Sequence, residues 1–288
     1  MIIGIDLGGT KIRAALLDQG AIIDERKVKS LAEMTVEESL AYLKKEVIAP
    51  LMNLAEEKGE KVKGIGMGVP SVVDTKLGIV YDVVKIPSWK EVHLKKELEN
   101  EFKVPVIVNN DANCFTLGEK YFGEGRPYAN MVGVALGTGV GAGVIINDML
   151  YNGHNTGAGE IGSMRYLEDV YEYYCASTFF SEIHKTTGEE LSGRAIAGDK
   201  EALILWAEYG THLGELLKVI LYAYDPEAVI LGGSLSKAFA FYKEAMLESA
   251  AKSCYFPNSL AKLVVKASAD PDNMPLLGVE ALVLEQID

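Results

Sequence analysis

Residues 1–29 read MIIGIDLGGTKIRAALLDQGAIIDERKVK and contain three apolar runs separated by two short breaks. The first break is Gly8-Gly9-Thr10, and the second is Asp18-Gln19-Gly20. Apolar runs divided by Gly, Asp and Asn turns are typical of strands joined in hairpins. The segment therefore predicts three consecutive strands joined by two tight turns.

The same pattern recurs near residue 131. Residues 131–151 read MVGVALGTGVGAGVIINDMLY, with a break at Gly137-Thr138-Gly139 and a turn at Asn147-Asp148. An internal repeat of one strand–turn–strand–turn–strand unit indicates two related domains. We expect them to face each other across a cleft, with the chain passing between them near residues 122–127.

The rest of the chain alternates helical and strand patterns, which favours an α/β fold. We expect helices at 36–58 (kinked or divided by Pro50), 94–102, 112–122, 172–184, 200–224, 237–252 and 276–284, and strands at 63–69, 104–108, 228–231 and 263–267. The closing helix can return to the first domain. The predicted division is a small N-terminal α/β domain of residues 1–122 plus 275–288 and a larger C-terminal α/β domain of residues 123–274.

Charge and composition exclude several classes of protein. With 28 Lys and Arg against 41 Asp and Glu, the net charge is −13, which disfavours binding to nucleic acid or to anionic membranes. No apolar run approaches the roughly 18 residues of a membrane span, and the N-terminus reads as a strand, so we expect a cytoplasmic protein. The three cysteines form no CxxC pair and suggest neither a disulfide framework nor a structural zinc site.

The two glycine-rich turns are candidate phosphate sites. In Asp6-Leu7-Gly8-Gly9-Thr10-Lys11, backbone amides can approach an anion closely, and the Thr hydroxyl and Lys ammonium add donors. The turn at 137–139 repeats the donors without the Lys. It also fits a loose GxGxxA pattern through Ala142, but a dinucleotide loop joins a strand to a helix, and here strands lie on both sides.

Asp111 is the candidate catalytic carboxylate. It follows the expected strand 104–108 and precedes the helix 112–122, so it lies at the carboxyl end of a strand, where open α/β sheets bind ligands. Phosphoryl transfer needs a base to receive the proton of the acceptor hydroxyl. The structural alternative is that Asp111 only caps the helix that follows it.

Six motifs together resemble the ROK family of sugar kinases and repressors. They are GIDLGGTK at 4–11, NNDAN at 109–113, ALGTGVGAGVI at 135–145, GAGEIGSM at 157–164, ILGGSLS at 230–236 and PLLGVEAL at 275–282. The resemblance implies a two-domain fold similar to actin and hexokinase, that is, a ribonuclease H-like fold, which closes over ATP, Mg²⁺ and a sugar.

The resemblance also implies a role for each matching residue. Asp111 would be the base acting on the sugar 6-hydroxyl, and Asp6 would orient the magnesium and phosphates. Sugar hydroxyls would be held by Asn110, Asp111, Glu160 and Glu172. The nucleotide would be bound by Asp6, Gly8, Gly9, Thr10 and Lys11 in one loop, by Gly137, Thr138 and Gly139 in the other, and by Gly232 and Gly233 near the adenosine.

The chain departs from the family where relatives bind zinc. The family commonly has a His where this chain has Ser163, and its CxCGxxGCxE motif is missing from residues 165–172, although Glu172 aligns with the final Glu of that motif. Without these ligands a zinc site of the family type cannot be built. The tyrosines at 166, 171, 173 and 174 either pack this loop in place of zinc or stack on the sugar.

The sequence therefore predicts an ATP-dependent hexokinase acting on glucose, with ATP and Mg²⁺ as cofactors. N-acetylmannosamine and fructose stay open as substrates. A sugar-responsive repressor is disfavoured because such relatives carry a DNA-binding segment ahead of the first phosphate motif, which here begins at residue 4. An actin-like ATPase without a sugar acceptor is the remaining alternative, and a homodimer is possible.

Overall fold

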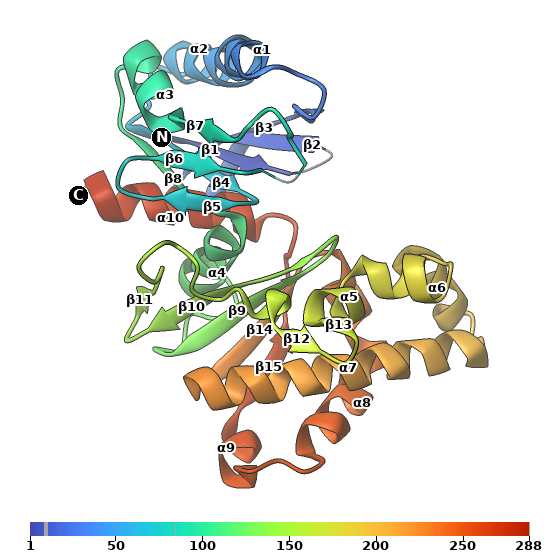
Figure 1. Cartoon of the computed structure of the whole chain (residues 1–288). Coiled ribbons are helices and arrows are strands. Elements are labelled where there is room, and N and C mark those ends of the chain that lie inside the picture. Colours follow the sequence, from blue (N-terminus) through green and yellow to red (C-terminus); the bar gives the residue numbers. More distant parts are fainter. Residues whose placement is uncertain (9–10, 84, 288) are drawn as a thin grey trace. The chain divides into compact units, whose positions relative to one another are not determined.

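A computed structural model describes residues 1–8, 11–83 and 85–287 (Figure 1). The chain divides into two compact units, each assembled from separate stretches of sequence. Unit 1 comprises Met1–Arg126, Leu150–Ala158 and Asn273–Asp288, and unit 2 comprises Pro127–Met149 and Gly159–Asp272. Within the described residues, no helix is both long enough and apolar enough to cross a membrane.

Unit 1 is built on a five-stranded mixed sheet. The first three strands form the meander that the opening sequence predicts, and β1 also pairs in parallel with β4, which pairs in parallel with β8. β1 is paired on both sides, and its apolar residues are almost completely buried. The strand order is β3 (Ala21–Lys29), β2 (Lys11–Asp18), β1 (Ile2–Leu7), β4 (Gly64–Val69) and β8 (Val106–Asn110).

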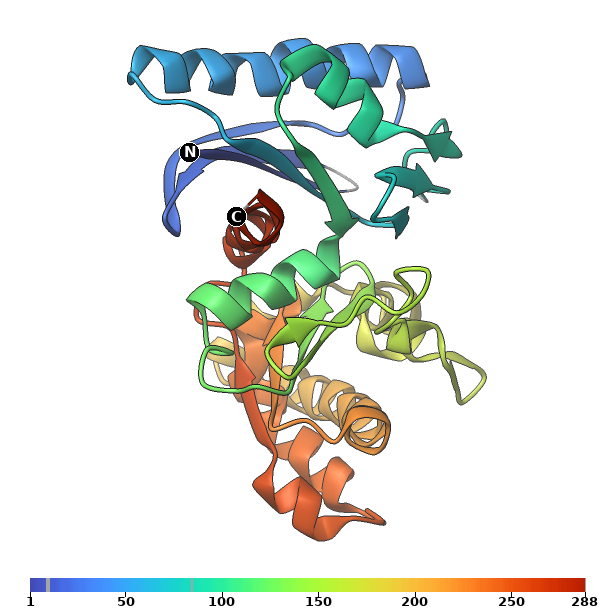
Figure 2. The ribbon, with the colours of Figure 1, turned by 90° about the vertical axis from the view of Figure 1, so that its left-hand side faces the viewer.

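Helices cover both faces of this sheet (Figure 2). One face carries α1 (Val36–Tyr42), α2 (Ala49–Glu57) and α3 (Leu94–Phe102). The other carries α10 (Met274–Ile287), with α4 (Asp111–Phe122) packed against it. A small antiparallel sheet that the sequence did not predict joins β5 (Val72–Asp74), β6 (Ile79–Tyr81) and β7 (Glu91–Val92).

The predicted helix 36–58 is divided near Pro50, but its parts follow one another without a non-helical residue between them. A π-helical turn, Leu43–Ile48, connects α1 to α2, and Pro50 lies in the first turn of α2. A proline has no N–H to donate and its ring clashes with the carbonyl of the preceding turn, so it is tolerated at a helix start. The wider π turn ends immediately before it.

Unit 2 repeats the strand order of unit 1. Its sheet again has a meander, which the internal repeat predicts, and on the other side of the central strand two further strands that pair in parallel. The order is β11 (Met149–Leu150), β10 (Val140–Ile146), β9 (Met131–Leu136), β14 (Ala228–Gly232) and β15 (Val264–Ala267). A separate hairpin is formed by β12 (Arg165–Tyr166) and β13 (Asp169–Val170).

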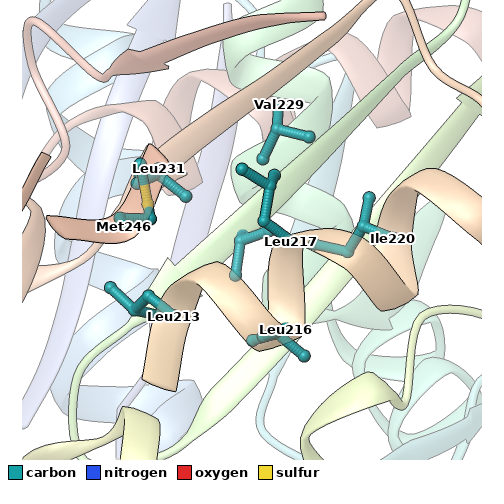
Figure 3. Close-up of a pocket in the computed structure, with 8 residues that line it drawn as sticks. Leu213, Leu216, Leu217, Ile220, Val229, Leu231 and Met246 are labelled. Atoms are coloured by element: carbon teal, nitrogen blue, oxygen red, sulfur yellow. The ribbon is translucent and has the colours of Figure 1, made fainter. Parts of the chain in front are cut away.

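The helices of unit 2 are α5 (Tyr171–Cys175), α6 (Gly188–Ile196), α7 (Lys200–Tyr224), α8 (Phe239–Ala251) and α9 (Pro257–Lys262). Short 3₁₀ turns occupy Ile161–Ser163 and Ser234–Ala238, and a π turn occupies Phe179–Ile183. A pocket of about 10 Å³ lies between α7, β14 and α8 (Figure 3). Its lining is entirely apolar, so it offers a water no polar partner and is a gap in core packing rather than a site.

Two predicted helices have different limits in the structure. The helix expected at 172–184 stops after Cys175 because the chain turns to let the Ser177 N–H donate to the Gly137 carbonyl at 2.8 Å. The helix expected at 237–252 is preceded by the 3₁₀ turn and becomes α-helical only from Phe239. At the first place, a hydrogen bond to a distant segment overrides the helical pattern.

The domain limits also differ from the prediction. Residues 150–158, expected in the C-terminal domain, belong to unit 1. The Thr156 hydroxyl donates to the Val73 carbonyl at 2.6 Å, and Asn152 accepts from Asn109 at 3.0 Å. These hydrogen bonds attach the segment to unit 1, although the sequence on either side of it belongs to unit 2. The unit boundaries at 126/127 and 272/273 replace the expected 122/123 and 274/275.

The contact between α4 and α10 is made by backbone. A Cβ atom on Gly118 would collide with the Met274 carbonyl, and one on Gly278 would collide with the Cys114 carbonyl. Each helix thus offers a glycine where the other presents a main-chain oxygen. The two axes can approach this closely only because neither position carries a side chain.

Gly278→Ala is expected to destabilise the protein by about 3 kcal/mol, since the new methyl group has no space and the helices must separate. Urea unfolding followed by circular dichroism measures this change. The matched control is Gly193→Ala in α6, where a Cβ meets nothing within 4 Å and the change should stabilise by up to about 1 kcal/mol. Equal effects of the two substitutions would contradict the backbone contact.

Candidate functional site

The strand register of unit 1 groups several of the candidate site residues. Asp6 lies opposite Arg13 on one side and Gly68 on the other, and Gly68 lies opposite Asn109. β1, β4 and β8 are parallel, so their carboxyl ends share one edge of the sheet. Gly68 leaves that row without a side chain, and a Cβ there would meet Cys114 Sγ at 3.2 Å and Asp111 Cα at 3.5 Å.

Asp6 is a perturbed carboxylate. Burial raises its pKa to about 6, although the positive charges of Arg13 and Lys11 oppose the shift. Arg13 is itself engaged with Glu25 at 2.5 Å and with Asn273 at 2.7 Å. Gly8 and Lys11 flank the first turn, whereas Gly9 and Thr10 lie outside the described residues, so their predicted roles stay predictions.

The residues at this edge are better suited to an open magnesium site than to a metal site enclosed by protein ligands. Mg²⁺ is commonly held by one or two carboxylates together with substrate phosphates and water. Asp6 provides one such carboxylate, with no hydrogen bond to it recorded from the described residues. Across the described part of the chain, no group of three or more His, Cys, Asp or Glu side chains is arranged to hold a metal ion.

Asn110, not Asp111, caps helix α4. The Asn110 side-chain oxygen accepts from the Ala112 N–H at 2.9 Å and from the Asn113 N–H at 3.3 Å. Asp111 is the first residue of the helix, is half-buried, and accepts from the adjacent Ala112 N–H at 2.9 Å. The alternative that Asp111 serves as the cap is therefore wrong.

Asp111 and Asp6 both act on Cys114 in unit 1. Burial raises the pKa of the Cys114 thiol, and the negative charges of Asp111 and Asp6 raise it further. Two carboxylates thus lie close enough to one buried thiol to influence its charge. The structure brings together these two predicted site residues, although they are about 100 positions apart in the sequence.

An amide network beside Asp111 was not predicted. The Asn113 amide donates to Asn109 at 3.0 Å and to Asn152 at 3.2 Å, and the Asn109 amide also donates to Asn152. Thr156, four residues beyond Asn152, has φ 58°, which is unusual for a β-branched residue. The repeated Asn in NNDAN was the available signal, but the contribution of Asn152 comes from a distant segment.

The second turn is held from α5. The Gly137 N–H donates to the Gly139 carbonyl at 3.0 Å, and the Gly137 carbonyl accepts from Ser177. Glu172 Oε2 accepts from the Val140 N–H at 2.9 Å. A Cβ on Gly139 would lie only 2.5 Å from that same oxygen, so the glycine permits the contact. The predicted sugar ligand Glu172 thus supports the turn directly.

Glu160 and Glu172 form a pair of like charges in unit 2. Glu160 directly precedes the 3₁₀ turn, and Glu172 lies in α5. Burial raises the pKa of Glu160, and the negative charge of Glu172 adds to the rise. The structure therefore places these two predicted sugar ligands near each other and beside the 137–140 turn.

In the same unit, Gly232 is the last residue of strand β14, and Gly233 follows it. Gly233 has φ 76°, and a Cβ there would collide with the Leu136 carbonyl at the end of β9. The Ser236 hydroxyl donates to the Gly233 carbonyl at 2.8 Å and stabilises the turn that follows. This glycine pair thus lies next to the strand that leads into the 137–139 turn.

Known proteins are similar to this chain in sequence and in fold. A model of the ROK family matches residues 2–286. A glucokinase of Thermotoga maritima is 27% identical over 99% of this chain and 98% of its own length, and a xylose repressor of Bacillus subtilis is 27% identical over 98% of this chain and 77% of its own length. The solved structure of a ROK family glucokinase from Streptomyces griseus in complex with glucose and AMPPNP is 26% identical, with a TM-score of 0.82 and 98% of each chain covered.

Glu172→Gln is expected to lower the pKa of Glu160 towards its usual value, because the substitution removes the neighbouring negative charge and leaves an oxygen to accept from Val140. Carboxyl ¹³C chemical shifts of glutamate-labelled protein, titrated with pH, measure the change. Glu168→Gln in the β12–β13 turn is the matched control and should leave the Glu160 titration unchanged. An unaltered Glu160 titration in Glu172→Gln would contradict the electrostatic coupling.

Proposed function

The chain belongs to the ROK family and is an ATP-dependent sugar kinase, and we propose that its acceptor is a hexose, with glucose as the first candidate, phosphorylated on the 6-hydroxyl. The observation that carries the proposal is the position of Asp111. It lies at the carboxyl edge of the unit 1 sheet, where its charge and that of Asp6 both act on the Cys114 thiol, and the N-cap of α4 is Asn110.

Asp111 is the general base of the proposed reaction. Its carboxylate accepts the proton of the 6-hydroxyl as the sugar oxygen forms a bond to the γ-phosphorus. The bond from that phosphorus to the β–γ bridging oxygen breaks, and ADP leaves with the electron pair. Asp111 is the first residue of α4, and the N-terminal end of a helix attracts negative charge.

The glycine turns and Asp6 handle the phosphates. In unit 2, the Thr138 and Gly139 amides and the exposed Thr138 hydroxyl bind phosphate oxygens. In unit 1, Lys11 provides a positive charge for the phosphates. Bound Mg²⁺ supplies neutralisation of the negative charge on the transferring group. Asp6 would orient it, and with a pKa of about 6 this carboxyl group is half protonated near pH 6 and becomes ionised as the pH rises above that value. Gly232 and Gly233 lie towards the adenosine.

Glu160, Glu172 and Asn110 hold the remaining sugar hydroxyls. Glu172 Oε2 already accepts from Val140, so Oε1 is the oxygen proposed for the sugar. Ser163, where the family commonly has a His, is exposed and follows Glu160 by three residues. This departure keeps N-acetylmannosamine and fructose as alternative acceptors.

The proposal is tested by ADP release with ATP and Mg²⁺ against a panel of glucose, mannose, fructose, N-acetylglucosamine and N-acetylmannosamine. Turnover with one hexose, and its loss when EDTA removes magnesium, supports the kinase proposal and identifies the acceptor. Turnover with N-acetylmannosamine or fructose but not glucose corrects the substrate. ATP hydrolysis that no sugar accelerates overturns the proposal in favour of an ATPase.

Asp111→Asn is expected to lower kcat by about 10²- to 10⁴-fold, because the amide cannot accept the proton of the sugar hydroxyl. Steady-state kinetics with the active sugar measure the loss, and the unfolding midpoint should change little. Asp24→Asn on the exposed edge strand β3 is the control and should retain full turnover. Normal turnover in Asp111→Asn would exclude its role as the base.

A further inference from the structure

The segment from Glu160 to Glu172 closes on itself. Tyr166 pairs with Asp169 across the β12–β13 hairpin, and the Tyr171 N–H donates to the Met164 carbonyl at 3.0 Å. The hairpin therefore joins the 3₁₀ turn that follows Glu160 to the helix that carries Glu172. Two strands of two residues each cannot fix a loop by their own backbone pairing, so other contacts must anchor it.

Those contacts come from an aromatic group that we term the Tyr166 cluster, made of Tyr166, Tyr171, Tyr174 and His212. The Tyr166 ring stacks on Tyr171 with centroids 4.3 Å apart and planes at 10°, and it meets Tyr174 edge-on at 5.4 Å. Its hydroxyl lies 3.1 Å from His212 Nδ1. The Tyr174 ring also contacts His212, at 5.1 Å.

The hydrogen bond in the cluster joins two uncharged groups. Burial raises the pKa of the Tyr166 hydroxyl and lowers the pKa of His212, although Glu208 and Glu215 oppose the change at the histidine. The tyrosine hydroxyl and the neutral imidazole therefore share a hydrogen bond in which neither partner carries a charge. His212 belongs to the 25-residue helix α7, whose inner face is buried in the core. The hairpin is therefore attached to a long helix of unit 2 that is itself fixed in the core.

Helix α5 carries this anchorage to the glycine turn. Tyr171 and Tyr174 of this helix belong to the cluster, and Glu172 between them accepts from the Val140 N–H. Two residues beyond the end of this helix, the Ser177 N–H donates to the Gly137 carbonyl. The turn is therefore held by Glu172 of α5 and by the residue that follows the helix cap, and the lack of room for a Cβ at Gly139 shows how closely helix and turn fit.

We infer that Tyr166 is a positioning residue: the Tyr166 cluster fixes α5 on α7, and α5 in turn holds residues 137–140 in the shape that binds nucleotide phosphate. The nucleotide part of this inference rests on the proposed kinase function. The mechanical part, from cluster to turn, stands on the contacts within unit 2 alone. The contacts of Tyr166 described above are with Tyr171, Tyr174, His212 and Asp169, so its effect on the turn passes through α5.

Hydrogen exchange tests the mechanical part without any ligand. Tyr166→Leu should speed exchange of the Val140 and Ser177 amides by about 10-fold, and Tyr166→Phe, which keeps the stacked ring but loses the hydroxyl, by about 3-fold. Tyr222→Leu is the matched control, since Tyr222 is also a tyrosine of unit 2 with edge-on aromatic neighbours and a hydrogen-bonded hydroxyl, at the far end of α7. Unchanged exchange in both Tyr166 variants, or equal acceleration in Tyr222→Leu, overturns the inference.

A double-mutant cycle tests the route through Glu172. Calorimetric titration with Mg²⁺-ADP should show that Tyr166→Leu and Glu172→Ala each weaken binding by about 10-fold, and that the double variant binds no more weakly than either single variant. The pair Tyr222→Leu and Glu172→Ala should show only the effect of Glu172→Ala. Fully additive losses for Tyr166 and Glu172 overturn the coupling, because the two residues would then act separately.

The two measurements also separate this inference from the proposed function. If the unaltered protein binds no Mg²⁺-ADP, the kinase proposal fails, and the exchange rates still decide whether the cluster holds the turn. If the protein binds Mg²⁺-ADP and Tyr166→Leu binds it equally well while exchange is faster, the inference fails and the kinase proposal stands. If Tyr166→Leu does not fold, Tyr166→Phe provides both readouts.

Discussion

The backbone contact between α4 and α10 determines where Asp111 lies. α4 begins at Asp111, so any shift of that helix moves the carboxylate by the same amount. Gly118 and Gly278 allow the two helices to touch through main-chain atoms, and α10 in turn packs on β1 and β4, the strands that carry Asp6 and Gly68. The distance from the sheet to α4 is thus set by rigid backbone rather than by adaptable side chains. Positioning at this precision is what a general base requires.

Unit 2 uses a different device for its glycine turn. The turn has few side chains with which to hold itself, and its shape depends on hydrogen bonds from outside. Glu172 of α5 supplies a carboxylate, and Ser177, two residues after the helix ends, supplies a backbone N–H. The early end of α5 and the extended backbone of Ala176 are therefore parts of one arrangement, in which the helix stops so that Ser177 can reach Gly137. A longer helix would have left the Gly137 carbonyl without this partner.

The sequence predicted the features that follow from local pattern and from repetition. The two meanders, the parallel strands beside them and the position of Asp111 after a strand were all readable from residue types and spacing. The family followed from six short motifs in order. The roles of individual site residues stay predictions.

What the sequence did not predict depends on contacts between distant segments. Residues 150–158 belong to unit 1 because of hydrogen bonds to Asn109 and Val73, and nothing in their own composition indicates this. Asn110 proved to be the cap of α4 because its backbone is extended, a property that residue type alone leaves open between Asn110 and Asp111. The predicted helix 172–184 was too long because a helical pattern does not reveal the demand of a carbonyl 40 residues earlier.

The discontinuous make-up of unit 1 also affects its biosynthesis. Its sheet is complete once β8 has been translated, but α10, which buries one face of that sheet, is translated only after all of unit 2. While the ribosome makes the intervening residues, α10 does not yet cover the sheet face that carries Gly4 and Gly66. During the same time, Gly118 of α4 has no helix to pack against. The unit that begins first is thus finished last, and the nascent chain carries an open apolar sheet throughout, a surface of the kind that chaperones shield.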